Sequence, residues 1–312
     1  MVDFIKLKED GDADDDGKKK KKMNFLSIKG FLIIFVVFFI ASSVIASFTY
    51  SLSSKIAVVP ISGPIMTEKT TSIYGSSISS RDIANTLRVI GEDSSIKAVL
   101  LDINSPGGSP VASEEISKAI EELKKKKKVY ALVNDVGASG AFWVAVSTDK
   151  IFASSMSTLG SIGVTSAGLS FEDFIREYNV TYRRQTAGKY KDMGTPYRKM
   201  SEEEEAIIQG LLDEIHGNFI SHVANSRNMN YSYVEEYATG EVFLGSKALR
   251  LGFIDEIAYY PDVIEELRKV SGAGSSAIIV NYGPEPTLLE VIGVETISEW
   301  FAPNTKSQLL LE

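Results

Sequence analysis

Apolar and polar positions along the middle of the chain fall into blocks typical of alternating strands and helices. Apolar runs over Lys55–Ile61, Ile96–Ile103 and Val129–Val133 predict three buried strands. Apolar residues at helical spacing predict helices over Arg81–Gly91 and Val111–Lys126. This alternation indicates an α/β fold with a parallel sheet between helical layers, in which sites form beyond the carboxyl ends of the strands.

The remaining pattern predicts shorter elements around this sheet. They are a polar loop over Gly63–Ser80, a helix from the Ser139 turn to about Thr148, strands over Ile151–Ala153 and Val180–Gln185, helices over Phe171–Tyr178 and Pro261–Val270, and a strand, turn and short helix over Gly240–Ile257. Ser201 and Glu204 form a capping-box pattern that opens a long helix to about Asn228. Leu288–Phe301 fits an apolar helix without an assigned role.

The amino-terminal pattern differs and predicts a membrane anchor. Residues 1–22 are charged and are expected to form a disordered cytoplasmic tail. No charge occurs from Gly30 to Ser54, so residues 23–54 are long and apolar enough for one transmembrane helix. Lys18–Lys22 precede this segment, and the positive-inside rule then places the rest of the chain outside the cytoplasm. Val44-Ile45-Ala46 also resembles a signal-peptide cleavage site, which is the alternative to a retained anchor.

Composition narrows the classes of function. The chain has 312 residues, a formal net charge of −8, two histidines and no cysteine. The negative charge disfavours nucleic-acid binding, although Lys124–Lys128 is a local basic run. The absence of cysteine excludes disulfides and thiolate zinc sites.

Two small-residue turns carry the candidate chemistry. Ser139 lies in Gly137-Ala138-Ser139-Gly140, between a predicted strand and a predicted helix, where a hydroxyl can meet a substrate and free amides can bind an oxyanion. Asn104-Ser105-Pro106-Gly107-Gly108 follows another strand; it is either a plain turn or a second source of such amides.

A nucleophilic serine needs a base, and the sequence offers few. His216 and His222 are six residues apart on one predicted helix, and each is expected to be an ordinary surface or packing residue. A buried lysine can serve instead, because burial disfavours its ammonium form. Lys189 and Lys191 lie in a loop closed by glycine and proline, and the pattern alone neither separates them nor excludes two solvated lysines.

From Lys55 to about Val270 the chain resembles the signal peptide peptidase A family. The segments that carry the resemblance are Asn104–Gly108, Ala138–Gly140, Asp149–Ala153, Gly160–Val164, Gly188–Asp192, Gly240–Phe243 and Leu251–Asp255. The family consists of membrane-anchored serine–lysine peptidases related in fold to Clp protease and crotonase. Residues 55–271 would then be the peptidase domain, and residues 272–312 an extension of unknown role.

The resemblance implies a role for individual residues. Ser139 would be the nucleophile and Lys191 the general base, oriented by a hydrogen bond from Ser161. Gly108, together with Gly107, would supply oxyanion amides. The single short unit would form a ring-like homo-oligomer, with peptide substrates and neither cofactor nor metal.

The resulting expectation is an extracytoplasmic, membrane-anchored endopeptidase that degrades cleaved signal peptides and similar short apolar peptides. The alternatives are a related membrane serine protease acting on one partner protein, a crotonase-type acyl-CoA enzyme, and a non-catalytic membrane scaffold.

Overall fold

A computed structural model of the chain describes residues 32–43, 53–72 and 75–283. The chain divides into two units, Met1–Leu52 and Ser53–Glu312. In the first unit, residues 32–43 form an α-helix whose side chains are all exposed. Within the part of the chain that is described, no helix is both long and apolar enough to cross a bilayer.

Several expected segments fall wholly or partly outside the described residues. The predicted tail, residues 1–22, lies outside them, and of the predicted anchor over 23–54 only 32–43 and 53–54 are described. The expected apolar helix Leu288–Phe301 also lies outside them.

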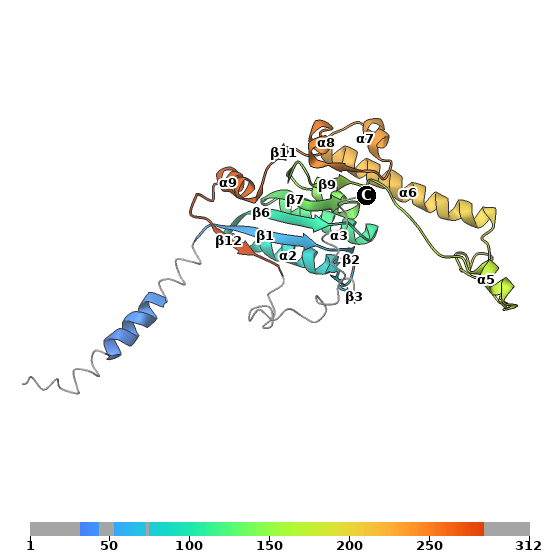
Figure 1. The fold of residues 1–312 in the computed structure, drawn as a ribbon. Coiled ribbons are helices and arrows are strands. Elements are labelled where there is room, and N and C mark those ends of the chain that lie inside the picture. Colours follow the sequence, from blue (N-terminus) through green and yellow to red (C-terminus); the bar gives the residue numbers. More distant parts are fainter. Residues whose placement is uncertain (1–31, 44–52, 73–74, 284–312) are drawn as a thin grey trace, which may run out of the picture. The chain divides into compact units, whose positions relative to one another are not determined.

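The second unit is built on an eight-stranded sheet in which six strands have the order β10-β9-β7-β6-β1-β12 (Figure 1). The other two strands extend from β7: β8 pairs with β7, and β11 pairs with β8. The strands are β1 (Lys55–Ser62), β6 (Ile96–Ser105), β7 (Lys128–Ala138), β8 (Lys150–Ala153), β9 (Thr158–Gly160), β10 (Val242–Leu244), β11 (Glu256–Ile257) and β12 (Ile278–Asn281). Neighbouring strands are parallel except β10, which runs antiparallel to β9. The predicted parallel sheet is confirmed.

Helices cover both faces of this sheet. The helices of this unit are α2 (Ser80–Glu92), α3 (Pro110–Lys124), α4 (Gly140–Val146), α5 (Glu172–Glu177), α6 (Glu202–Arg227), α7 (Tyr231–Tyr237), α8 (Gly245–Arg250) and α9 (Tyr260–Val270), and α5 lies away from the sheet (Figure 1). The capping box predicted for the long helix is present: Ser201 N–H donates to Glu204 Oε2 at 2.9 Å, and Glu204 N–H donates to Ser201 Oγ at 3.3 Å. Ser109 and Pro110 similarly begin α3, with the serine as N-cap.

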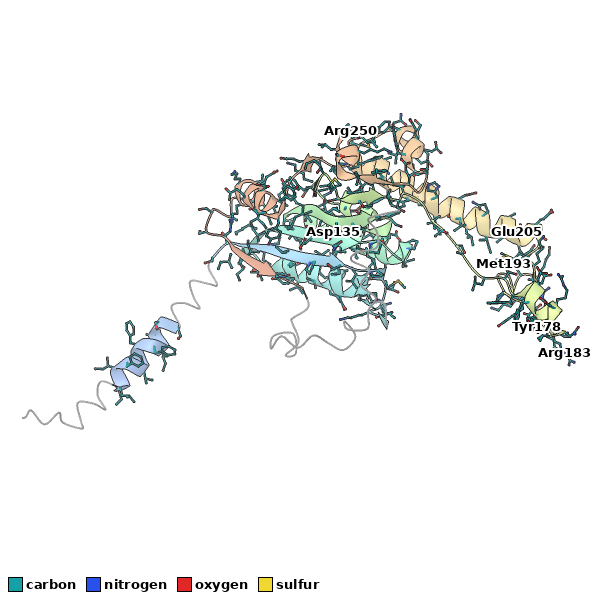
Figure 2. All side chains as sticks on the ribbon, viewed as in Figure 1. Asp135, Tyr178, Arg183, Met193, Glu205 and Arg250 are labelled. Atoms are coloured by element: carbon teal, nitrogen blue, oxygen red, sulfur yellow. The ribbon has the colours of Figure 1, made fainter. Side chains whose placement is uncertain are left out.

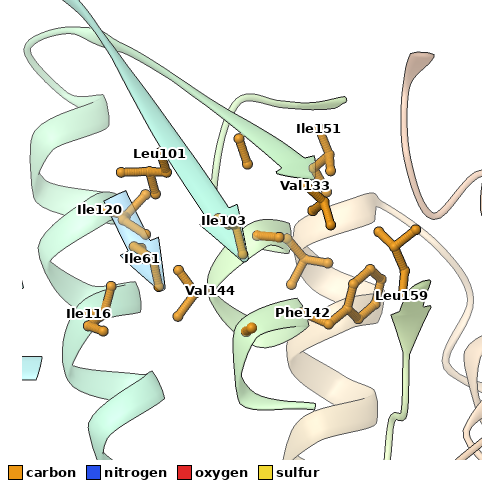
Figure 3. Packing of buried hydrophobic residues seen from close by; sticks show 14 of the residues in the cluster. Ile61, Leu101, Ile103, Ile116, Ile120, Val133, Phe142, Val144, Ile151 and Leu159 are labelled. Atoms are coloured by element: carbon orange, nitrogen blue, oxygen red, sulfur yellow. The ribbon is translucent and has the colours of Figure 1, made fainter. Parts of the chain in front are cut away.

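Alternate residues of the central strands enter two separate cores. Val99, Leu101 and Ile103 of β6 pack with α2, α3, α4 and α6 on one face, and Figure 3 shows this core around Phe142. Leu100 belongs to the second core, which α9 covers. A strand buried on both faces reads as a continuous apolar run, which is why these strands were predictable.

Some predicted elements differ in the structure. The expected loop Gly63–Ser80 contains four two-residue strands, β2 (Ile65–Met66), β3 (Thr71–Ser72), β4 (Gly75–Ser76) and β5 (Ile78–Ser79). β12 was not expected; it pairs with β1 beyond the predicted domain limit at residue 271. α7 and β9 were not expected either.

A long excursion, called the arm here, connects β9 to α6 and comprises residues 164–200. None of its side chains is buried, and α5 lies within it (Figure 1). The predicted strand Val180–Gln185 was wrong, because this segment forms no strand and its residues are exposed. Alternation of apolar residues cannot make a strand without a partner strand to complete its hydrogen bonds.

The basic run Lys124–Lys128 holds the amino-terminal edge of the sheet together. Lys124 Nζ donates to the carbonyl of Ser147 at 2.8 Å, and Lys127 Nζ donates to those of Asp93 and Ile96 at 2.6 and 2.7 Å. The three remaining lysines pair with Glu122, Glu92 and Asp149. These cations are engaged within the chain, so the run is structural.

Candidate active site

Ser139 lies in a strained elbow between β7 and α4. Its φ and ψ are 52° and −125°, in a region that non-glycine residues rarely occupy. The Ser139 amide donates to the carbonyl of Gly160 at 2.8 Å, and its carbonyl accepts from the amides of Phe142 and Trp143 at 2.9 and 3.0 Å. This strand–turn–helix geometry is the one in which hydrolases hold a nucleophilic serine.

The glycine turn after β6 packs directly on this elbow. A Cβ on Gly107 would lie 2.5 Å from the nitrogen of Gly140 and 2.9 Å from Cβ of Ser139. A Cβ on Gly108 would lie 2.1 Å from the carbonyl oxygen of Ile65. A side chain on Gly107 would clash with the Ser139 elbow and one on Gly108 would clash with β2, so both positions require glycine.

Two amides remain available beside the serine. Gly107 N–H donates to Ser105 Oγ at 3.1 Å, so it is already engaged. Among the residues that the structure describes, the amides of Gly108 and Gly140 have no acceptor. Two such donors beside a serine can stabilise the oxyanion of an acyl-transfer intermediate. Gly140 was not singled out in the sequence, although free amides at the start of the helix were expected.

A pocket opens in front of Ser139. Its lining comprises Gly108, Pro110, Ser113, Ser139, Gly140, Trp143, Ser161, Gly163, Val164, Thr165, Ser166, Gln209, Leu212, Asp213, Ile215, His216, Phe219, Ala238, Thr239 and Gly240. The structure therefore brings Ser139, Gly108 and Ser161 together. Ser161 has a φ of 50°, and its amide donates to the carbonyl of Glu241 at 2.8 Å, which fixes it at the pocket.

Lys191 lies elsewhere. Its side chain is exposed on the arm and does not line the Ser139 pocket. Figure 2 labels Met193, two residues further along the arm, well away from Asp135 near the end of β7. Within one copy of the chain, the predicted nucleophile and base are therefore not brought together.

The two loop lysines have different surroundings. Lys189 forms an ion pair with Glu203, and the hydrogen bonds that Lys189 makes with Glu203 and Tyr190 raise the pKa of Lys189 above its ordinary value. Lys189 is thereby held as an ammonium ion and is a poor base. In the described part of the chain, Lys191 has no carboxylate partner.

A partly buried charge cluster ties the Lys191 loop to the start of α6. The Arg198 guanidinium contacts both oxygens of Asp192 at 2.9 and 3.1 Å and both oxygens of Glu204 at 2.6 and 2.8 Å. Arg184 adds a second ion pair to Asp192 at 2.7 Å. Hydrogen bonds from Arg198 and Ser201 lower the pKa of Glu204 to about 2, so the cluster is ionised at neutral pH.

The two histidines separate in the structure. His222 is a packing residue, as expected: it stacks on Trp143 with ring centroids 4.3 Å apart, and its Nε2 lies 3.0 Å from Ser147 Oγ. Burial lowers the pKa of His222. His216 lines the Ser139 pocket, and its expected role as an ordinary surface or packing histidine stays a prediction. Its Nε2 is buried and has no hydrogen-bond partner among the described residues.

Comparison with known proteins places these residues in a family. The sequence model of peptidase family S49 matches residues 121–274, a range that includes Ser139 and Lys191. A candidate protease of Methanocaldococcus jannaschii is 36% identical over 64% of this chain and 64% of that protein. A candidate signal peptide peptidase SppA of Enterococcus faecium is 36% identical over 64% of this chain and 58% of its own length.

A third relative shares more of its length with this chain. A candidate protease of Synechocystis is 32% identical over 68% of this chain and 78% of that protein. Among solved structures, a mutant ClpP1 of Listeria monocytogenes matches with a TM-score of 0.44 and 16% identity over 66% of this chain and 92% of that one; a likeness this weak carries no argument. The sequence matches show that the chain belongs to peptidase family S49, the signal peptide peptidase A family.

Proposed function

We propose that the chain is a serine endopeptidase with Ser139 as nucleophile and Lys191 as general base. The observation that carries the proposal is the strained Ser139 elbow, with two amides free to bind an oxyanion at the mouth of a pocket. Membership of a peptidase family supports the same chemistry.

Lys191 reaches Ser139, in this proposal, from a neighbouring copy of the chain. The arm that carries it has no fully buried residue, and ion pairs between Asp192, Arg198 and Glu204 hold the loop at the start of α6. Such an arm can extend to the pocket of the next subunit. The contact is head-to-tail, and repeated head-to-tail contacts form a ring where the rotation between subunits closes.

The reaction follows from these positions. The neutral Lys191 amine accepts the proton of Ser139 Oγ while that oxygen forms a bond to the substrate carbonyl carbon. The carbonyl electron pair moves to the oxygen, and the amides of Gly108 and Gly140 stabilise the resulting oxyanion. The carbon–nitrogen bond breaks, and the lysine ammonium gives its proton to the leaving amine. Water deprotonated by the same lysine then releases the acyl group and restores the serine hydroxyl.

The proposed substrates are cleaved signal peptides and similar short apolar peptides at a membrane. Leu212, Ile215 and Phe219 give the Ser139 pocket an apolar wall that suits such segments. The proposed anchor is residues 23–54, of which residues 32–43 form a helix with exposed apolar side chains. The peptidase domain would then lie outside the cytoplasm.

Active-site labelling tests the proposal. A fluorophosphonate probe should label Ser139, as shown by peptide mapping, and Ser139→Ala should abolish both labelling and peptide hydrolysis. Labelling without peptide cleavage would favour a different serine chemistry. Absence of labelling in an assembled, folded protein would refute the nucleophile and favour a crotonase-type enzyme or a scaffold. Peptides of varied length and hydrophobicity separate a signal peptide peptidase from a protease of one partner protein.

A further inference from the structure

The Ser139 pocket contains a carboxylate that the proposed reaction does not use. Among the described lining residues, Asp213 of α6 is the one acidic side chain, and none of them is a lysine or arginine. Gln209 Nε2 donates to Asp213 Oδ1 at 2.7 Å, and no ion pair engages Asp213 within the described part of the chain. The pocket therefore contains one carboxylate that no lysine or arginine of the pocket lining neutralises.

The neighbours of Asp213 are suited to a particular kind of ligand. Leu212, Ile215 and Phe219 of the same helix line the pocket, as does Trp143 of α4. Lysine and arginine bury their methylene stems on apolar surface while the charged end stays near water and carboxylates. An exposed carboxylate beside apolar walls can therefore bind a lysine or arginine side chain: the carboxylate pairs with the charged end, and the apolar walls contact the methylene stem.

From this arrangement we propose that Asp213 is a specificity-determining residue, which binds a lysine or arginine side chain of the peptide substrate next to the scissile bond. The inference rests on the proposed peptidase function. It agrees with the proposed substrates, because signal peptides carry a basic region before their apolar stretch. The enzyme would then favour cleavage where an apolar segment meets a basic residue.

Matched peptides test the inference. A fluorogenic series with one position near the scissile bond changed among lysine, arginine, glutamine and glutamate gives the ratio of kcat/KM for basic over neutral residues. We expect wild type to favour the basic peptides by about two- to fivefold, the size of an exposed charge pair. Asp213→Asn should remove that ratio and leave kcat/KM for the glutamine peptide within about twofold. Asp213→Lys should reverse it in favour of glutamate.

Glu214→Gln is the matched control, because Glu214 is exposed on the same helix and does not line the pocket. It removes the same charge and should keep the wild-type ratio. An unchanged ratio in Asp213→Asn would overturn the inference, as would an equal loss with every peptide, which would assign Asp213 to the reaction centre. Failure of the proposed peptidase function gives a different result. If Ser139→Ala still cleaves the series, Ser139 is not the nucleophile, and this conclusion does not depend on Asp213.

Discussion

Replacement of Gly140 by alanine is predicted to lower activity because of one nearby atom, Ser113 Oγ. The φ of Gly140 is not positive, so alanine can adopt the same backbone conformation. The Cβ of that alanine, however, would lie 2.3 Å from Ser113 Oγ. The same Cβ would lie 3.2 Å from the nitrogen of Gly108 and 3.4 Å from Cβ of Ser113. Gly140→Ala should therefore cost about 1–3 kcal/mol of unfolding free energy as an overpacked site.

The activity should fall further than the stability. The clash displaces the two turns that present the Gly108 and Gly140 amides, and loss of one oxyanion donor lowers kcat by about 10²–10³. Ser113→Ala removes the clashing oxygen and leaves the other two contacts at 3.2 and 3.4 Å. By itself it removes the hydrogen bond from Ser113 Oγ to the carbonyl of Ser109, at about 0.5–1.5 kcal/mol.

The assay is a double-mutant cycle that measures kcat with a fluorogenic peptide and unfolding free energy with urea. The double variant Gly140→Ala/Ser113→Ala should be more stable than Gly140→Ala and should recover at least about tenfold in kcat, because the closest contact is gone. If the double variant is no better than Gly140→Ala in either measurement, the proposed contact is not the cause. Wild-type kcat in Gly140→Ala would refute the oxyanion geometry itself.

Three further outcomes follow from the site. His216→Ala should keep kcat within about tenfold of wild type, since its buried Nε2 cannot receive the serine proton without moving; a loss comparable to that of Ser139→Ala would make His216 the base. Lys189→Ala should keep most activity in the same peptide assay, because Glu203 holds that lysine as an ammonium ion, and an inactive protein would mean that the two loop lysines have been assigned the wrong way round. Unfolding free energy should decrease as the pH falls below about 6.5, because the unfolded chain then binds a proton that buried His222 resists. His222→Gln should flatten that pH dependence in urea titrations, and an unchanged slope would contradict the assignment.

The sequence predicted the parts of the fold whose residues are buried on both sides. β1 and β6 read as continuous apolar runs, and the capping box of α6 is visible in Ser201 and Glu204 because it depends on neighbours in sequence. β12 was missed although Ile278-Ile279-Val280 is a β-branched apolar run, because the run is short and its place beside β1 is set by contacts distant in sequence.

The site was predictable to a similar extent. Ser139 and Gly108 come together because both follow parallel strands, whose carboxyl ends share one edge of the sheet. The position of Lys191 could not be predicted, since an arm without buried residues has no internal pattern that fixes its direction. The places of His216 and Asp213 in the pocket were not predicted, because the apolar residues of α6 are not confined to one face and packing against α4 decides which face meets the pocket.

The central claim, a dyad shared between neighbouring copies, is tested most directly by subunit mixing. Ser139→Ala and Lys191→Ala proteins carrying different tags are each expected to be inactive, and assemblies containing both are purified through the two tags in succession. At equal mixing, about a quarter of the sites combine an intact serine with an intact lysine from the neighbour, so we predict about a quarter of wild-type activity. Mixed assemblies that remain as inactive as either parent would contradict a lysine supplied by the neighbouring subunit.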